Sequence, residues 1–179
     1  EVLQYALDPG DIRPLEAQAL LAGIVLDTKN FSVRTGSRTF EAAAFLRRTG
    51  ADTVDVKKLF QSDLEATVAR YRVVQAARLY RNEIAIAAYP STLSRTVAAQ
   101  AADELLNISG ILTSFVLYPA GEQVIISARS IGECNVQVVL EALGGGGNAA
   151  TAGAQVKGKP LREVLEALVA SIDKFYENS

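Results

Sequence analysis

The amino-acid sequence predicts an α/β protein in which helices come first and a mixed unit of strands and helices follows from about residue 83. Three observations support this class. Apolar residues before Asn82 recur mainly at helical spacing, short apolar runs of strand length alternate with helical stretches after it, and turn-forming residues separate the runs. A chain of 179 residues buries enough surface to fold without disulfides.

The part before Asn82 contains four helical patterns. Thr39 suits the N-cap of the second, Asp52 or Thr53 the N-cap of the third, and Ser62 opens the fourth. The fourth pattern is typical of a connector between two lobes and equally of a plain surface helix. We expect helices over residues 15–26, 40–48, 53–60 and 63–81.

The part after Asn82 reads as strands and helices in alternation. Ser94 suits the N-cap of its first helix, residues 120–122 a hairpin turn, and Asn148 the N-cap of a short helix after four glycines. We expect strands over residues 84–88, 112–118, 124–129 and 155–157, and further helices over residues 94–106, 136–143 and 160–176.

Composition and charge exclude several classes of protein. The chain carries 18 Lys and Arg against 20 Asp and Glu, a balance that argues against binding long nucleic acids. It has no His, which removes His-dependent catalytic triads and His-rich zinc sites. The lone Cys134 has no internal disulfide partner. We see no membrane span or signal peptide. The start at Glu1 and the absence of Met suggest an excised part of a longer chain.

Two candidate sites lie in the helical part. Asp27 directly follows an apolar helix, where a carboxylate suits a hard divalent metal, although its spacing alone favours a turn cap. Arg34 and Arg38 flank Gly36 just before a helix, where they are placed to hold a phosphate. The alternative for these two arginines is a solvated loop.

The strongest candidate lies in the second part of the chain. Four glycines in succession, Gly144–Gly147, lose much conformational freedom on folding, so we expect a ligand to approach their bare backbone at the start of the helix at Asn148. Arg129, at the end of a strand of the same unit, would supply positive charge. A flexible glycine linker is the alternative.

These segments resemble a known family. The block LLAGIVLDTKNFSVRTGSRTFEAA, followed by ISARS, GECNVQVVLEALGGGG and AGAQ, is similar to the DHH/DHHA1 phosphoesterase superfamily, and within it to GdpP-type, membrane-anchored cyclic-di-AMP phosphodiesterases. The resemblance covers nearly the whole chain. It implies the end of a DHH domain at residues 1–61, a connector helix at 62–82 and a substrate-binding DHHA1 domain with a mixed sheet at 83–179.

The resemblance also implies site residues. Asp27 matches a late metal-ligand aspartate, and Arg34 and Arg38 remain candidate phosphate ligands. Two Mn²⁺ ions are expected in the parent enzyme but not bound stably here, because the DxD and DHH motifs are absent. Asn148 stands where the family usually has His. The expected substrate-binding residues are Ser127, Arg129, Ser130, Asn135, Gly144, Gly145, Gly146, Gly147 and Asn148.

The function implied is substrate binding within a hydrolase that converts cyclic-di-AMP to pApA, the chain alone being inactive. The alternatives are a nanoRNase or pAp phosphatase of the same superfamily and a non-catalytic cyclic-dinucleotide-binding module. Expected partners are a cyclic dinucleotide or a short oligonucleotide, and a homodimer stays open. The resemblance places the chain in the cytoplasm, with membrane contact only through N-terminal segments of the parent.

Overall fold

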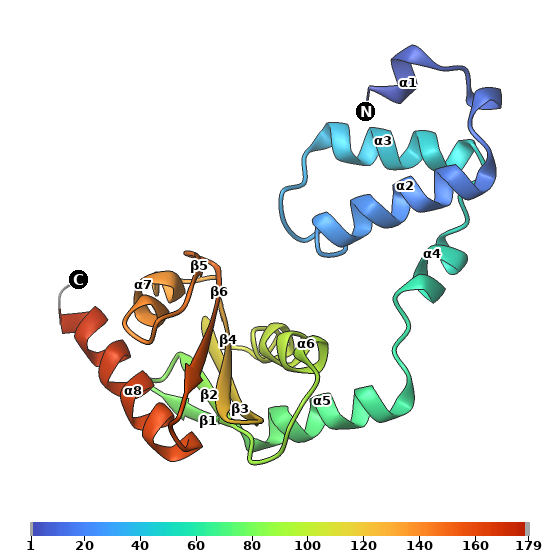
Figure 1. Cartoon of the computed structure of the whole chain (residues 1–179). Helices are drawn as coiled ribbons and strands as arrows, with labels where there is room; N and C mark the ends of the chain where they lie inside the picture. Colours follow the sequence, from blue (N-terminus) through green and yellow to red (C-terminus); the bar gives the residue numbers. More distant parts are fainter. Residues whose placement is uncertain (1, 178–179) are drawn as a thin grey trace. The chain divides into compact units, whose positions relative to one another are not determined.

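The computed structural model describes residues 2–177 and divides into two compact units (Figure 1). The first unit comprises the described residues up to Ser62, and the second unit begins at Asp63. Within the described part of the chain, no helix is both long enough and apolar enough to cross a bilayer.

The first unit is helical. Its elements are α1 (Leu3–Ala6), the 3-10 helix η1 (Pro9–Asp11), α2 (Pro14–Asp27), α3 (Ser37–Arg48) and α4 (Thr53–Leu59). Pro14 occupies the first position of α2, where its fixed φ suits the start of a helix. A small core joins α2, α3 and α4 around Leu21, Phe45 and Val56.

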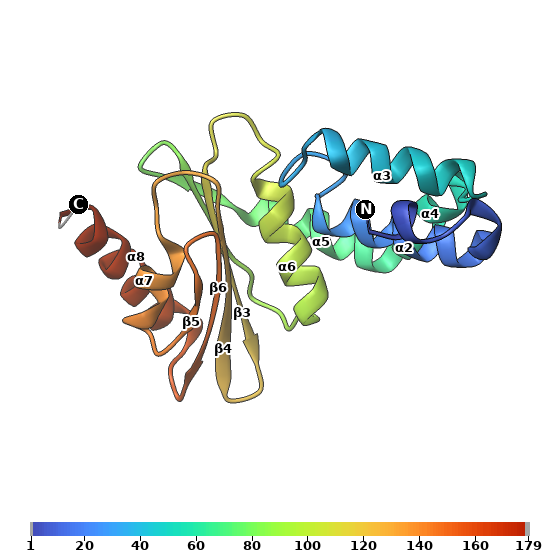
Figure 2. The same ribbon diagram turned by 90° about the horizontal axis from the view of Figure 1, so that it is seen from above.

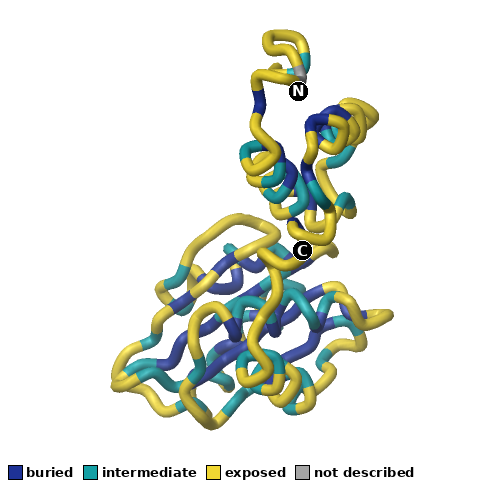
Figure 3. Tube along the Cα trace, turned by 90° about the vertical axis from the view of Figure 1, so that its right-hand side faces the viewer, coloured by how far each residue is buried: buried dark blue, intermediate teal, exposed yellow. Residues whose placement is uncertain are grey.

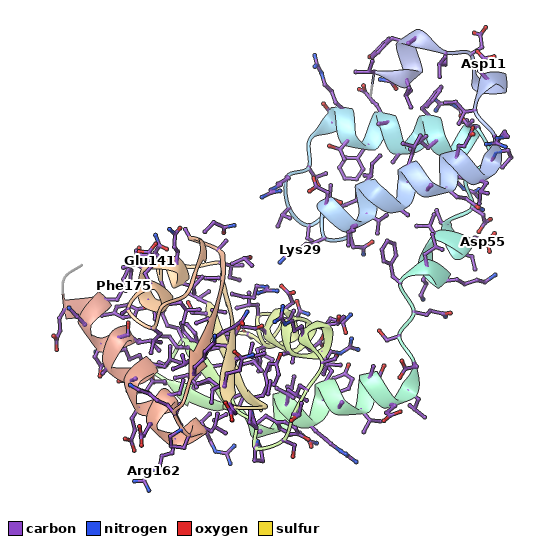
Figure 4. The ribbon with its side chains drawn as sticks, in the orientation of Figure 1. Asp11, Lys29, Asp55, Glu141, Arg162 and Phe175 are labelled. Carbon is purple, nitrogen blue, oxygen red and sulfur yellow. The ribbon has the colours of Figure 1, made fainter. Side chains whose placement is uncertain are left out.

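The helices α2 and α4 confirm the expected ones, with a correction at α3. The Asp52 carboxylate caps α4 by accepting hydrogen bonds from the amides of Val54 and Asp55, and Asp55 itself lies on α4 (Figure 4). The helix α3 is capped by Gly36, so the prediction of Thr39 as the N-cap was wrong. The Thr39 hydroxyl accepts a hydrogen bond from the Gly36 amide at 3.3 Å, as the third residue of a helix can do.

The second unit is built on a mixed sheet, as the sequence predicted. Its strands within the described residues follow the order β1-β2-β3-β4-β6-β5, with β2 and β3 parallel and the other neighbours antiparallel. The strands are β1 (Arg78–Tyr80), β2 (Ile84–Ala88), β3 (Thr113–Ala120), β4 (Gln123–Ser130), β5 (Gly146–Asn148) and β6 (Thr151–Lys157). The helices are α5 (Leu64–Ala76), α6 (Arg95–Leu105), α7 (Val136–Glu141) and α8 (Leu161–Glu177).

Helices cover both faces of this sheet. Figure 2 shows α7 and α8 on one side of the strands and α6 on the other. Phe115, Leu117 and Ile126 lie in the core shared with α7 and α8, whereas Val116 and Tyr118 lie in the core shared with α5 and α6. The central strands are therefore buried on both faces, as the tube coloured by burial shows (Figure 3).

Two predicted elements were wrong. The helix expected to reach residue 81 ends at Ala76, because Ala77 is already extended and the chain enters β1 at Arg78. Arg81 and Asn82, with φ of 48° and 64°, then turn β1 back onto β2. No helix begins at Asn148. The chain instead forms the hairpin of β5 and β6, so the strand expected over residues 155–157 starts at Thr151.

Candidate functional site

A cleft of about 500 Å³ opens on the α6 side of the sheet, within the second unit. The register brings Ser127 of β4 beside Gly153 of β6, and Gly153 beside Gly146 of β5. The lining residues come from α6, β4, the glycine loop and β6: Arg95, Ala99, Ile125, Ile126, Ser127, Gly144, Gly145, Gly146, Gly153, Ala154 and Gln155. The structure thus brings Ser127 and three of the predicted glycines to one cleft.

The four glycines have different physical reasons for lacking a side chain. A Cβ on Gly145 would lie 2.5 Å from the carbonyl oxygen of Gly153, and one on Gly147 would collide with the Thr151 carbonyl. Gly144 adopts φ of 75°, which L side chains rarely tolerate. Around Gly146 a Cβ would meet no atom within 4 Å. The same holds around Gly144, so the described structure leaves open space for an approaching molecule beside Gly144 and Gly146.

The amides of this loop are partly occupied. The Gly144 amide donates to the Glu141 carbonyl at 3.0 Å, and the Gly145 amide donates to the Leu140 carbonyl at 2.8 Å. These bonds end α7 in the way that glycines commonly end helices. The loop therefore does not form the expected nest of free amides at a helix start. Its main contribution to the cleft is a backbone without side chains.

Asn148 caps a turn rather than a helix. Its Oδ1 accepts hydrogen bonds from the amides of Ala150 at 3.0 Å and Thr151 at 2.9 Å. Asn favours helix N-caps and such turns for the same reason, which is why the sequence signal was misread. Asn148 is exposed and pairs with Thr151 next to Arg129 in the sheet register.

The motif SARS divides between the two faces of β4. Ser127 and Arg129 face α6, while the pleat directs Ser130 to the opposite face. The Ser130 hydroxyl is buried, lies 3.2 Å from the Thr113 hydroxyl and accepts a hydrogen bond from the Gly132 amide. In the described structure, the Ser130 side chain therefore makes its hydrogen bonds inside the unit and does not face the cleft.

Arg129 is held by an acid. Its Nε donates to Oδ1 of Asp103 on α6 at 3.2 Å, and its Nη1 donates to the Ala128 carbonyl at 2.9 Å. The Arg129 side chain is 14% exposed and that of Asp103 42%. These two contacts use two of the five N–H donors of the guanidinium and fix its orientation. Arg129 is not among the residues that line the cleft, but it lies two residues along β4 from Ser127, which lines it.

Asn135 lies at the start of α7. Its Oδ1 accepts hydrogen bonds from the amides of Gln137 at 3.1 Å and Val138 at 3.4 Å, so it acts as the N-cap of that helix. It is not among the residues that line the cleft.

The remaining predicted residues lie in the first unit. Asp27 ends α2, and its Oδ1 lies 3.5 Å from Nη1 of Arg34, both side chains being mostly exposed. Arg38 lies in the first turn of α3. Among residues 2–177, no three Asp, Glu or Cys side chains come together in a group that could hold a metal ion. The described donors therefore do not fit a two-metal site.

The backbone beside Asp27 is unusual. Three successive residues that are not glycine, Lys29, Asn30 and Phe31, have positive φ. The Phe31 ring stacks on Phe40 with centroids 5.3 Å apart, and the Phe31 amide donates to the Thr28 hydroxyl. Such backbone strain often marks functional segments and persists only where surrounding contacts hold it.

Two cleft residues, Arg95 and Gln155, were not among the predicted site residues, although Gln155 ends the AGAQ segment that carries the resemblance. Arg95 is the first residue of α6, and Gln155 lies on β6 opposite Ile125. The sequence did contain a signal for Arg95. Arg95, Ala99 and Asp103 are four residues apart, so they share one face of the predicted helix. Near this end of α6, burial raises the pKa of Tyr118, and the charge of Arg95 opposes that shift.

Comparisons with known proteins agree with this fold. A family model described as "DHHA1 domain" matches residues 82–178. The chain is 45% identical to "Cyclic-di-AMP phosphodiesterase GdpP" of Bacillus subtilis and 42% identical to "Cyclic-di-AMP phosphodiesterase PdeA" of Listeria monocytogenes, in both cases over 99% of this chain. These matches cover 28% and 27% of the two relatives, so the chain spans just over a quarter of their length.

Among solved structures, an exopolyphosphatase-related protein from Bacteroides fragilis superposes with a TM-score of 0.83. The superposition covers 93% of this chain and 52% of that one, at 18% identity, and so shows a shared fold. The resemblance found in the sequence motifs is confirmed by the family match and the two relatives. The chain belongs to the DHHA1 domain family.

Proposed function

We propose that this chain is the nucleotide-binding part of a phosphodiesterase that hydrolyses cyclic-di-AMP to pApA, and that the cleft on the α6 side of the sheet holds the nucleotide. The observation that carries this proposal is the cleft itself, which joins Ser127, Gly146 and a neighbouring guanidinium at one place. The names of two relatives, 45% and 42% identical over 99% of the chain, support the substrate class.

The cleft suits a phosphate-bearing ligand. Ser127 offers a hydroxyl that donates a hydrogen bond, and Arg129 beside it is already oriented by Asp103. Gly146 and Gly153 leave the exposed face of β5 and β6 without side chains, so a ligand can lie close to the strands. Charge-assisted hydrogen bonds of Arg to phosphate would supply most of the affinity.

Hydrolysis would require metal ligands that the described residues do not bring together. In this family the metal we expect is Mn²⁺, and Asp27 would be one of its ligands. A single exposed carboxylate paired with Arg34 cannot hold two ions. We therefore expect the 179-residue chain to bind nucleotide without cleaving it. Cleavage of cyclic-di-AMP in the presence of Mn²⁺ that disappears in Asp27→Ala would contradict this expectation.

Calorimetric titration of the 179-residue chain tests the proposal. The ligands are cyclic-di-AMP, pApA, AMP and cyclic-di-GMP. We expect adenine dinucleotides to bind, and Arg129→Ala to weaken them about 10-fold or more, because it removes charged hydrogen bonds to phosphate. Arg129→Lys keeps the charge and tests whether the forked geometry matters. Absence of binding by both adenine dinucleotides at millimolar concentration would overturn the proposal.

A further inference from the structure

A second arginine lines the cleft and is not part of the SARS motif. Arg95, at the first position of α6, contributes to the lining together with Ala99 one turn later. Its side chain is exposed, and within residues 2–177 its guanidinium has no hydrogen-bonded or ion-paired partner. An arginine that faces a cleft without an acid nearby keeps its full charge for a ligand.

The two arginines of this region differ in their surroundings. The charge of Arg129 is compensated by Asp103 at 3.2 Å, whereas Arg95 has no such acid among the described residues. This contrast arises on one face of α6, since Arg95, Ala99 and Asp103 are spaced by four residues. In the described structure, the helix thus presents an unpaired positive charge in the cleft lining at Arg95 and, through Asp103, holds the other arginine in place eight residues later.

The backbone positions of the two arginines are well separated along the sheet and along α6. Arg95 shares the cleft lining with Ile125 and Gln155, which pair across the sheet, and Arg129 lies four residues further along β4. Four residues of a strand span about 13 Å. On α6, Asp103 lies eight residues after Arg95, a rise of about 12 Å. A ligand with anionic groups at two places can therefore contact each guanidinium with a different group.

We propose that Arg95 binds a second phosphate, so that the cleft selects nucleotides with two phosphate groups over mononucleotides. The proposal rests on the proposed function of the cleft and names the feature of the substrate that this cleft recognises. One phosphate lies toward Arg129 and the other toward Arg95, with Ser127 between them. The small residues Ala99, Gly146 and Gly153 leave room for the intervening nucleoside.

The test compares pApA, which has two phosphates, with AMP, which has one. Both are titrated calorimetrically into the wild-type chain and into Arg95→Ala. We expect Arg95→Ala to weaken pApA about 10-fold or more, the loss typical of a charged hydrogen bond, and to weaken AMP by less than about 3-fold. Arg72→Ala is the matched control, because Arg72 is an exposed arginine of the same unit outside the cleft lining.

Salt dependence provides a readout that a structural role of Arg95 would not change. Added salt screens attraction between a guanidinium and a phosphate, so each such contact makes binding more sensitive to salt. We expect Arg95→Ala to make pApA binding less sensitive to salt concentration. Arg95→Lys, which keeps the charge, and Arg72→Ala should both retain the wild-type sensitivity to salt.

The outcomes separate the two proposals. If the wild-type chain binds pApA but Arg95→Ala behaves like Arg72→Ala, the role of Arg95 is overturned and the proposed function stands. Equal weakening of pApA and AMP by Arg95→Ala also overturns it, because Arg95 would then contact the same phosphate as Arg129. If the wild-type chain binds neither pApA nor cyclic-di-AMP, both proposals fail.

Discussion

The two units of the chain enclose their apolar residues to different degrees. In the second unit, helices cover both faces of the sheet, and Phe115, Leu117 and Tyr118 on one strand have no exposed surface. In the first unit the described core is small, and Leu15 and Leu26 of α2 are 73% and 68% exposed. Apolar periodicity predicted helix α2 correctly, but not that so much of its surface would be exposed.

This difference indicates which unit supplies the stability of the described structure. Burial of apolar surface is the main favourable term in folding, and it is concentrated in the second unit. The candidate cleft therefore lies on the unit that we expect to be the more rigid. Rigid elements hold binding side chains more precisely than loosely packed ones.

The largest expected effect comes from removing a core side chain of each unit. Phe115→Ala deletes a fully buried ring, and we expect it to reduce the free energy of unfolding of the second unit by about 3–5 kcal/mol. Leu21→Ala in the smaller core of the first unit should cost about 2 kcal/mol. Amide hydrogen exchange, followed separately on β3 and α2, measures both effects.

The same hydrogen-exchange measurement can contradict the conclusion that the two units differ in stability. If Phe115→Ala lowered protection in α2 as much as in β3, the two units would unfold as one block rather than separately. Leu26→Ala is the control within the first unit, because an exposed leucine should change stability by no more than about 0.5 kcal/mol.

Sequence patterns predicted most of the second unit. Strand β2 matches its predicted bounds, and β4 extends its own by one residue at each end. Strand β3 begins one residue later and ends two residues later than predicted. Ser94 caps α6 by accepting a hydrogen bond from the Val97 amide at 3.1 Å. These elements follow from local signals, namely apolar runs of strand length and a short polar side chain before a helix. Local signals were sufficient to predict these elements, because the tertiary packing of the unit favours the same secondary structure.

The glycine loop could not be predicted in the same way. The bare backbone at Gly145 and Gly147 is required by atoms of Gly153, Thr151 and Ala152, which come from another strand. A close approach across the sheet leaves no trace in local periodicity. The sequence correctly indicated that something lies against these glycines, but at two of them the described structure shows that it is the protein's own main chain.

The role of Arg95 was missed for a related reason. Helical periodicity shows that residues 95, 99 and 103 share a face, but not which part of the sheet that face meets. The register of β4 with β6 decides it, by placing Gln155 beside Ile125 and Thr151 beside Arg129. Strand pairing is a property of the fold, and it was needed before the cleft could be recognised.

A smaller effect tests how tightly the second unit is packed at its glycine hairpin. Gly145→Ala places a methyl group 2.5 Å from the Gly153 carbonyl oxygen, and we expect a loss of about 1–3 kcal/mol in the free energy of unfolding. Gly146→Ala meets no atom within 4 Å and should change stability by about 0.5 kcal/mol or less. Urea denaturation followed by circular dichroism measures both.

Gly145 and Gly146 both line the cleft, so substitution of either should weaken pApA binding. Only Gly146→Ala should do so while leaving the fold intact, because its methyl group meets no protein atom within 4 Å. A Gly146→Ala chain that is as unstable as Gly145→Ala would show that the open space at Gly146 is filled by the protein itself. The cleft would then be narrower than the structure indicates.

The smallest expected effect concerns the polar contacts that hold α8 against the sheet. The Asp173 carboxylate accepts hydrogen bonds from the Tyr80 hydroxyl at 2.6 Å and from Nε of Arg81 at 3.0 Å. These bonds, that of Tyr80 first, hold the pKa of Asp173 below its ordinary value of 3.8. The stabilisation is therefore fully present above that ordinary pKa and is lost as the pH falls through the lower pKa of the folded state.

We expect Asp173→Asn to remove this acid-dependent part, so that stability falls less steeply below about pH 4 than in the wild-type chain. Glu163→Gln is the matched control, because it removes the same charge from an exposed position on the same helix. Thermal unfolding at a series of pH values measures the slopes. Equal slopes for Asp173→Asn and the wild type would mean that the core between α8 and the sheet, rather than this polar cluster, keeps the helix in place in acid. Apolar packing alone would then account for the attachment of α8 to the sheet of the second unit.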